Sequence, residues 1–175
     1  MSPLARLRLL AFALAGVIFV VDQWLKHYVN DVLGLDRDGE TLKLLPFFDF
    51  TRTSNYGVSL GMLTADSMEM RWGLVAMTML IALGVSFWML RERQRWDLIP
   101  LAMVLGGALG NIRDRVRFGY VVDFADLHFG TFRPFLIFNL ADAAITIGVV
   151  IILARSFLSR EKPAQAEPAQ PAVES

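Results

Sequence analysis

An acid inside a long apolar run restricts the possible folds and functions of this chain more than any other feature of its sequence. The run covers residues 135–154, and Asp142 is its eighth residue. A helix of that length spans about 30 Å, the thickness of the hydrocarbon core of a bilayer, so Asp142 would lie about 10 to 12 Å below one face. An ionisable side chain at that depth is a functional candidate. The alternative is a hydrogen bond to a neighbouring helix that serves packing alone.

A second acid, Asp123, precedes Asp142 by nineteen residues, near the end of the segment 106–124. Two adjacent carboxylates share one proton, because both cannot stay ionised together. Such a pair contains one acid and one base. We therefore expect Asp123 and Asp142 to activate a water and to act on a carbonyl without a covalent intermediate.

Composition places the chain among small membrane proteins. Hydrophobic residues make up 55% of its 175 residues and charged residues only 19%, which is too apolar for an ordinary soluble domain. The formal net charge of zero argues against a nucleic-acid partner. Cysteine is absent, and His27 and His128 have no metal-ligand spacing, so we expect no metal and no cofactor.

Four apolar runs predict an all-α membrane domain over residues 1–158, with a small extramembrane β part. The four transmembrane helices are expected at about 7–28, 73–90, 98–110 and 135–154. The first run resembles a secretory signal peptide, but no cleavage site follows it and its helical pattern continues through Lys26. Gly106 and Gly110 in the third run have the spacing of a close helix contact. Residues 159–175 are rich in Pro, Ala and Gln and predict a disordered tail.

Basic residues set the expected orientation. They gather before the first helix, at residues 91–95 and after the last helix, which predicts that both termini are cytoplasmic. The loops 30–71 and 111–134 would then lie on the periplasmic side. Three arginines there depart from this bias, so we expect them to pair with acids or to bind lipid phosphate: Arg113, Arg115 and Arg117.

Both outer loops contain patterns typical of strands. Residues 41–50 and 51–63 predict two short strands, with a break or an edge at Pro46. Residues 120–127 and 132–137 predict a hairpin that lies over the membrane surface. Asp123 would be on the first strand of that hairpin.

Two further polar groups leave alternatives open. Asp22 and Lys26 are four residues apart on one helix face, which suits either a local ion pair or a direct part in chemistry. Asp114 is expected to pair with nearby arginines.

Serine catalysis is the lesser hypothesis, because no histidine accompanies the candidate serines and Lys26 lies in a different segment from all of them: Ser54, Ser59 and Ser67.

Five motifs follow one another between about residues 7 and 155. They are Asp22-Gln23 with Lys26, Asn55-x-Gly57, Gly110-Asn111-x-x-Asp114-Arg115, Gly119-x-Val121-x-Asp123-Phe124, and Phe138-Asn139-x-Ala141-Asp142. Together they resemble the ordered motifs of the lipoprotein signal peptidase family, signal peptidase II. The resemblance implies an aspartic endopeptidase of the bacterial inner membrane that removes signal peptides from diacylglyceryl-modified prolipoproteins by cleaving before the lipidated cysteine.

The resemblance also implies roles for individual residues, with Asp123 and Asp142 as the catalytic pair. Eight more match positions that line the substrate site in the family: Asp22, Lys26, Asn55, Gly107, Asn111, Arg115, Asn139 and Ala141. The implied partners are lipid-modified prolipoproteins, membrane lipids and the cyclic peptide inhibitors of the family. Departures from the family pattern affect the shape of the pocket and inhibitor sensitivity rather than the reaction: Leu25, residues 56–60 and Arg113.

Two other classes of function compete with a protease. A small proton-coupled transporter would use Asp22 and Asp142 as relay carboxylates within the membrane. Four short spans without internal repeat symmetry argue against that reading. A purely structural role as a membrane subunit would not explain why acids and arginines occur on the outer side.

Overall fold

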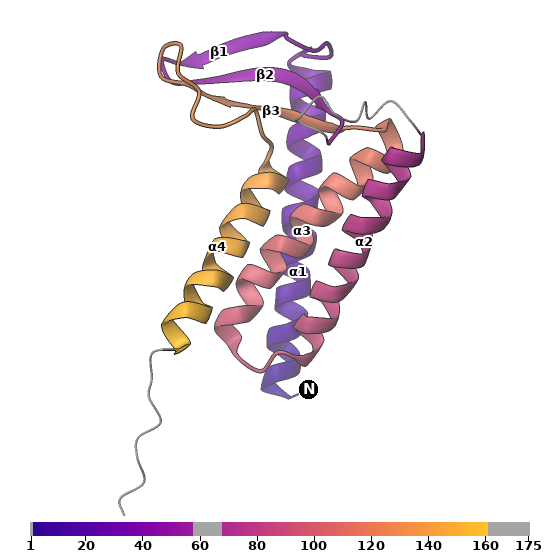
Figure 1. Cartoon of the computed structure of the whole chain (residues 1–175), viewed down its shortest axis with the longest axis vertical. Coiled ribbons are helices and arrows are strands. Elements are labelled where there is room, and N and C mark those ends of the chain that lie inside the picture. The colour runs from indigo at the N-terminus through magenta and orange to yellow at the C-terminus, as the bar shows by residue number, and fades with distance from the viewer. Residues whose placement is uncertain (1, 58–67, 161–175) are drawn as a thin grey trace, which may run out of the picture.

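The computed structural model describes residues 2–57 and 68–160, with side chains as far as Leu158. The described helices are α1 (Pro3–His27), α2 (Met68–Arg91), α3 (Arg95–Phe118) and α4 (Leu140–Arg160), and a π-helical turn, η1 (Tyr28–Val32), continues α1. The described strands are β1 (Thr41–Leu45), β2 (Phe48–Asn55) and β3 (Val121–Leu127). Figure 1 shows the sheet lying across one end of the helices, which we name the sheet end. The N-terminus and the α2–α3 connection lie at the opposite end, the loop end.

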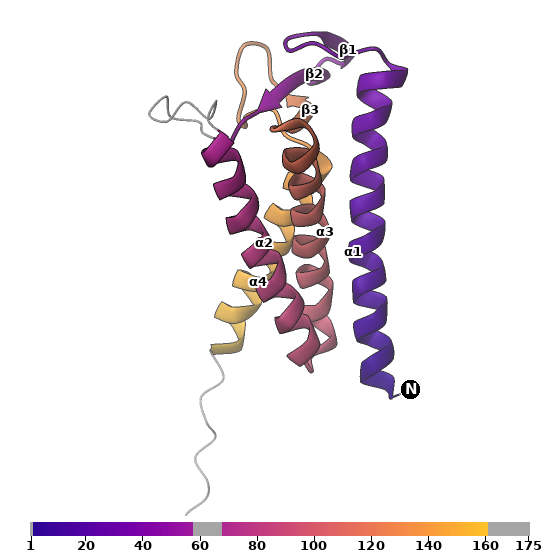
Figure 2. The same cartoon turned by 90° about the vertical axis from the view of Figure 1, so that its right-hand side faces the viewer.

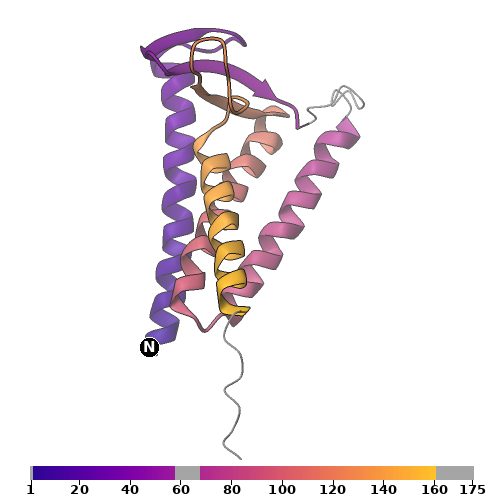
Figure 3. The ribbon, with the colours of Figure 1, turned by 60° about the vertical axis from the view of Figure 1, so that its left-hand side comes forward.

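Helix α3 is the centre of the bundle and packs against the other three helices. It lies between α1 and the α2–α4 pair in Figure 2, and Figure 3 shows α2 leaning away from α1 toward the sheet end. Two glycines permit this close packing. A Cβ atom on Gly106 would lie 2.6 Å from the Ala15 carbonyl oxygen, and one on Gly110 would lie 2.5 Å from Asp22 Oδ2. The predicted small-residue contact is therefore confirmed.

The outer faces of α1, α2 and α4 are apolar and exposed. Leu10 is 64% exposed, Leu80 69% and Phe157 67%, as expected for side chains that face lipid. Three described helices are long and apolar enough to cross a membrane: Pro3–Val32, Met68–Arg91 and Leu140–Leu158. The chain is thus a mostly helical membrane protein with a small antiparallel sheet.

Helix α3 is longer than the 98–110 span that the apolar run predicts, so part of the expected 111–134 loop is helical. Its last turns are polar, and it is absent from the three apolar spans of the described chain. The helix continues because Asn111 and Asp114 are buried against α1 and find polar partners there. It ends at Gly119, whose φ of 92° is the left-handed conformation that glycine adopts without strain.

Helix α4 begins at Leu140 rather than at residue 135. Phe138 instead pairs with β3, accepting hydrogen bonds from Phe124 N at 3.1 Å and from Ala125 N at 2.7 Å. These backbone bonds hold the residues before α4 in an extended conformation. Asp142 consequently lies in the first turn of the helix, as its third residue rather than its eighth.

Helices α1 and α2 also begin earlier than the predicted 7–28 and 73–90. The side chain of Ser2 caps α1 by accepting a hydrogen bond from Ala5 N at 3.2 Å. Helix α2 already begins at Met68 and includes part of the polar stretch before residue 73. The bundle therefore extends further into polar sequence at these ends than the apolar runs suggest.

The sheet has the order β1-β2-β3, with both neighbouring pairs antiparallel. The expected break at Pro46 is confirmed, because β1 ends at Leu45 and β2 begins at Phe48. Of the expected 120–127/132–137 hairpin only two isolated antiparallel bridges form, Ala125↔Phe138 and Phe129↔Phe132, and the strand that pairs with β3 is β2.

Packing explains the choice of partner for β3. Phe124 and Ala125 form a core with Val29 at the end of α1, and the rings of Phe50 and Phe124 meet edge to face at 5.5 Å. This core fixes the sheet on α1. The predicted tail 159–175 begins too early, because α4 continues to Arg160, and its residues 161–175 lie outside the described residues. Outside them too lie the outer part of the expected 51–63 strand, Ser59 and Ser67.

Candidate active site

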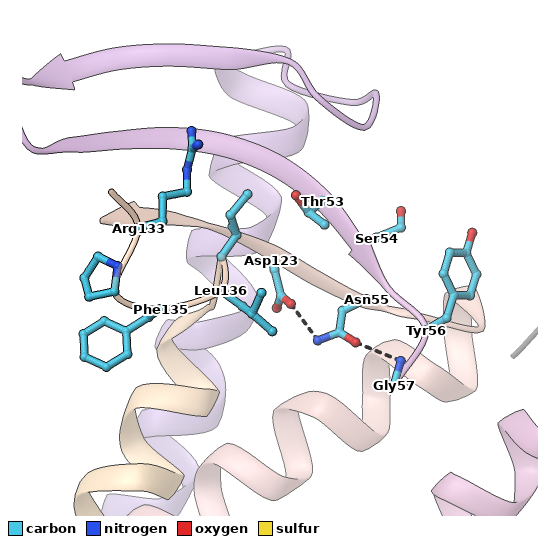
Figure 4. Close-up of a pocket in the computed structure, with 11 residues that line it drawn as sticks. Thr53, Ser54, Asn55, Tyr56, Gly57, Asp123, Arg133, Phe135 and Leu136 are labelled. Atoms are coloured by element: carbon cyan, nitrogen blue, oxygen red, sulfur yellow. Dashed lines mark hydrogen bonds between the residues drawn. The ribbon is translucent and has the colours of Figure 1, made fainter. Parts of the chain in front are cut away.

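Asp123 lies in the middle of the sheet end. It is on β3 opposite Thr53 of β2, and only 1% of it is exposed. Asn55 Nδ2 donates to its Oδ2 at 2.9 Å, and Asn139 Nδ2 donates to its Oδ1 at 2.6 Å. Figure 4 shows the Asp123 side chain directed toward Asn55, whose own oxygen accepts from Gly57 N. Two neutral amides thus hold this carboxylate.

Asp142 belongs to a reciprocal cap at the start of α4. Its N–H donates to Asn139 Oδ1 at 2.9 Å, while Asn139 N lies 3.4 Å from Asp142 Oδ2. This is the geometry of a capping box, in which the first residue and the third helical residue satisfy each other. Asn111 Nδ2 of α3 donates to Asp142 Oδ1 at 2.8 Å. The carboxylate of Asp142 is thereby fixed from two helices.

Asn139 joins the two acids, since it bonds Asp123 with its amide and caps the turn that contains Asp142. Burial raises the pKa of Asp123 to about 7, and the charge of Asp142 acts in the same direction. The hydrogen bonds from Asn55 and Asn139 oppose this rise. The arrangement favours one shared proton near neutral pH, which is what acid and base catalysis by two carboxylates needs.

Two cavities open at the acids and meet at Phe135 and Leu136. The larger, about 710 Å³, is lined by Asp123, the end of β2 and residues 133–137. The smaller, about 250 Å³, is lined by Asp142 and by apolar side chains of α4. A substrate that filled both would pass the two carboxylates.

A second group of charges lies beneath this pair, and we name Asp22, Lys26 and Asp114 the buried charge cluster. Lys26 Nζ is 2.8 Å from Asp22 Oδ2 and 2.8 Å from Asp114 Oδ2. The predicted ion pair of Asp22 and Lys26 is therefore confirmed. The expected pairing of Asp114 with arginines is wrong, because the continued α3 helix turns this acid toward Lys26 on α1.

The buried charge cluster supports the candidate active site from behind. Lys26 Nζ donates to Asn111 Oδ1 at 3.3 Å, and Asn111 in turn donates to Asp142. Asp22 Oδ1 accepts from Ala141 N at 3.0 Å. The cluster thereby fixes both the start of α4 and the amide that orients Asp142.

The eight predicted substrate-binding residues separate into groups. Asn55 lines the larger cavity, whereas Asn111 and Asn139 bind the carboxylates. Four others line neither of the two cavities. They serve close packing or charge pairing behind the site: Asp22, Lys26, Gly107 and Ala141.

Arg115 is the remaining predicted substrate residue. Its Nε is buried and has no hydrogen-bond partner within residues 2–57 and 68–160. A Cβ on Gly57, at the rim of the larger cavity, would lie 3.6 Å from Arg115 Nη2. The Nη2 end of this guanidinium therefore lies beside the rim of the larger cavity, while its Nε is enclosed by protein.

Gln23 and Asp114 occur in the sequence motifs, and the structure places both behind the two acids. Gln23 Nε2 donates to both Asp22 Oδ2 and Asp114 Oδ1 at 3.0 Å, and Asp114 Oδ2 accepts from Val122 N next to Asp123. The sequence signal for Asp114 is its spacing from Asn111, three residues apart on one helix face. A predicted third helix that ends at residue 110 hides this spacing.

Comparison with known proteins adds independent information. The family described as "Signal peptidase (SPase) II" matches residues 14–158. A lipoprotein signal peptidase of Sphingopyxis alaskensis is 52% identical over 173 residues, covering 99% of this chain and 97% of the relative. One of Rhizorhabdus wittichii is 48% identical and covers 91% and 92%.

Solved structures agree with these sequence matches. A structure described as a bacterial membrane enzyme, obtained by the in meso method, has a TM-score of 0.76 at 25% identity and covers 91% of this chain and 94% of its own. A second structure with the same description has a TM-score of 0.73 at 27% identity, covering 87% and 94%.

Proposed function

Because the chain belongs to the signal peptidase II family, we propose that Asp123 and Asp142 are its catalytic pair. The chain has lipoprotein signal peptidase activity and is an aspartic peptidase of that family. The single observation that carries the assignment of the pair is the position of Asn139, which bonds one carboxylate and caps the turn of the other. Two acids held in this way suit the activation of a water against a peptide carbonyl.

We propose that Asp142 is the base and Asp123 the acid in the resting enzyme. Asp142 lies at a helix N-terminus, where the helix dipole and the Asn139 N–H favour a negative charge. Lys26 adds positive charge behind it through Asn111. Asp123 is almost fully buried, and its raised pKa of about 7 favours the protonated form. Asp142 would remove a proton from water while Asp123 protonates the scissile carbonyl oxygen.

The two cavities suggest how the substrate lies. We propose that the peptide of a lipid-modified prolipoprotein occupies the larger cavity, with its backbone near Arg115 Nη2, which lies beside Gly57 at the rim. The diacylglyceryl group would follow the smaller, apolar cavity along α4, where Ile147 is exposed on the lipid-facing side. Cleavage would then fall just before the lipidated cysteine, where the two cavities meet.

We propose a four-span arrangement in the bacterial inner membrane, with residues 1–158 as one domain and the active site toward the periplasm. Helix α3 would be the fourth span, because three apolar helices surround it and its polar residues have protein partners. The arginines at the loop end favour the cytoplasm. Reporter fusions after residue 95 should be cytoplasmic and those at residue 129 periplasmic; the opposite pattern would contradict this orientation.

The decisive experiment compares the two acid variants on one substrate. Asp123→Asn and Asp142→Asn should each lower cleavage of a diacylglyceryl-modified precursor by about a thousandfold or more, since neither the acid nor the base can be an amide. Both variants should still bind the precursor. Near wild-type cleavage by either variant would refute the proposed pair.

The same assay tests the part played by the lipid. The wild-type enzyme should cleave the lipidated precursor and leave the unlipidated one almost intact, because the acyl chains bring the cysteine to the membrane surface. Comparable cleavage of both would exclude the proposed place of the diacylglyceryl group. The transporter alternative loses its support, because family membership makes the chain a peptidase and Asp22 is paired with Lys26.

A further inference from the structure

A third cavity lies at the sheet end, apart from the two cavities at the aspartates. It measures about 300 Å³ and lies between the end of α1 and the last turns of α3. Lys26 and Asp114 of the buried charge cluster form part of its wall. It shares no lining residue with the cavities that contain Asp123 and Asp142. The peptidase reaction therefore leaves this space without a role.

The charges that line this cavity favour an anion. Arg113 and Arg117 are four residues apart, so they project from one face of α3, and both are exposed. Lys26 lies between two carboxylates, of which only Asp114 belongs to the lining. The other acid in the lining, Asp31, is paired with His27. The lining therefore contains Lys26 and two guanidiniums against two carboxylates, an excess of one positive charge.

Within residues 2–57 and 68–158, neither arginine forms an ion pair with an acid. Arg113 donates to the side-chain oxygen of Gln23, which is uncharged. The guanidinium of Arg117 lies 5.0 Å from the centre of the Phe118 ring, and no carboxylate pairs with it in the described part of the chain. Two unneutralised arginines at the outer end of a membrane helix run against the usual distribution of positive charge.

The depth of the cavity matches the headgroup region of a bilayer. On α1, Trp24 is 56% exposed and stacks on Tyr28 with ring centres 5.5 Å apart. On α3, Phe118 lies beside the cavity and is 40% exposed. Exposed aromatic side chains at helix ends mark the boundary between hydrocarbon and water, and guanidinium groups there bind phosphate in a bidentate manner.

We propose that this cavity binds the phosphodiester of a glycerophospholipid headgroup, held by Arg113 and Arg117 apart from the residues that line the catalytic cavities. A phosphodiester carries one negative charge, which balances the one excess positive charge of the lining. Its acyl chains would lie along the exposed apolar face of α1, where Val17 and Val20 are exposed. The bound lipid would fasten the sheet end of α1 to α3.

The test measures how added lipid raises the thermal unfolding temperature of the whole detergent-purified protein. Dilauroyl phosphatidylglycerol should raise this temperature in a saturable manner. The Arg113→Gln/Arg117→Gln variant should need about tenfold more lipid for half of the effect, because it loses two charge-assisted contacts. The matched control, Arg91→Gln/Arg93→Gln, removes the same charge at the loop end and should respond as the wild type does.

Further measurements identify the source of the phosphate and control for misfolding of the double variant. Dilauroylglycerol, which has the same chains without phosphate, should have little effect, and inorganic phosphate at the same concentration should have none. Arg117→Gln alone removes no contact to Gln23 and should still need several-fold more lipid, whereas Arg117→Lys should retain most of the response. An equal effect of dilauroylglycerol or inorganic phosphate, or an unchanged response of the double variant, would overturn the proposal.

Discussion

Two groups of acids lie next to each other in this protein, and they differ in the side chains that surround them. The buried charge cluster places Lys26 between Asp22 and Asp114, with both contacts at 2.8 Å. The proposed catalytic pair, Asp123 and Asp142, receives hydrogen bonds only from neutral amides and a backbone N–H in the described residues.

The comparison teaches how the same side chain serves structure or chemistry. A lysine between two carboxylates offsets their charge and bonds to both, so the three side chains hold α1 and α3 together. Amides orient a carboxylate without supplying a charge, so burial and mutual repulsion keep a proton on the pair. Asn111 connects the two groups, since it accepts from Lys26 and donates to Asp142.

Removal of the lysine should have the largest effect. Lys26→Met leaves two carboxylates buried without a cation, which costs about 3 to 5 kcal/mol of folding free energy. We expect little folded protein in detergent by size-exclusion chromatography and circular dichroism. Lys26→Met/Asp114→Asn should regain part of the yield, because one uncompensated charge is gone. A fully stable Lys26→Met protein would contradict the structural role of the cluster.

This cluster also marks the limit of what the sequence predicts. The two acids, the asparagines and the helical class follow from motif order and apolar runs, because those features depend on local sequence. The partner of Asp114 does not, since it requires knowing that α3 continues to Phe118 and packs on α1. A run of glycines before polar residues reads as a helix end, and tertiary packing against Ala15 overrides that signal.

The position of Asp142 was hidden for a related reason. Residues 135–139 are as apolar as a helix would need, yet the backbone of Phe138 bonds to β3 instead. Strand partners far apart in sequence cannot be read from local periodicity, which is also why the pairing of β2 with β3 was missed. The cap formed by Asn139 is visible as a motif only once the helix start is known.

The connection between the two groups gives the next largest effect. Asn111→Ala removes the donor to Asp142 and one acceptor of Lys26. We expect kcat on a lipidated precursor to fall about a hundredfold, while KM changes little. A fall of this size is typical of the loss of general-base catalysis when the base is no longer oriented. Asn30→Ala is the control, because its partner is Arg52, away from both acids. A change in KM alone would show that Asn111 binds substrate instead.

The pH dependence of the rate should separate the two groups further. With the pKa of Asp123 raised to about 7, this residue loses its proton above that pH. We expect kcat/KM to fall about tenfold per pH unit on the basic side, because the acid is lost. Asn55→Ala removes a hydrogen bond that lowers this pKa, so its fall should begin at a higher pH. An identical basic limb in both proteins would remove Asp123 as the source.

The smallest expected effect is a pH-dependent difference in thermal stability. The folded pKa of Asp123, about 7, is above its ordinary value of 3.8, so between these values the folded state binds more protons than the unfolded state. The contribution of Asp123 to the free energy of unfolding of the wild type is therefore fully present below about pH 4. It is lost as the pH rises through about 7. Asp123→Asn has no such group, so its unfolding temperature relative to wild type should increase from about pH 5 to about pH 8.

A neighbour on the same strand supplies the opposite sign for comparison. The hydrogen bond from Arg133 holds the pKa of Asp126 below its usual range, so the stability from this acid is present above about pH 4 and is lost only as the pH falls through the lowered pKa. Asp126→Asn should therefore be less stable than wild type by a nearly constant amount between about pH 5 and pH 8. Differential scanning fluorimetry in detergent measures both series. If the Asp123→Asn difference were as flat as that of Asp126→Asn, the proton would not reside on Asp123, and the proposed roles of the two catalytic acids would have to be exchanged.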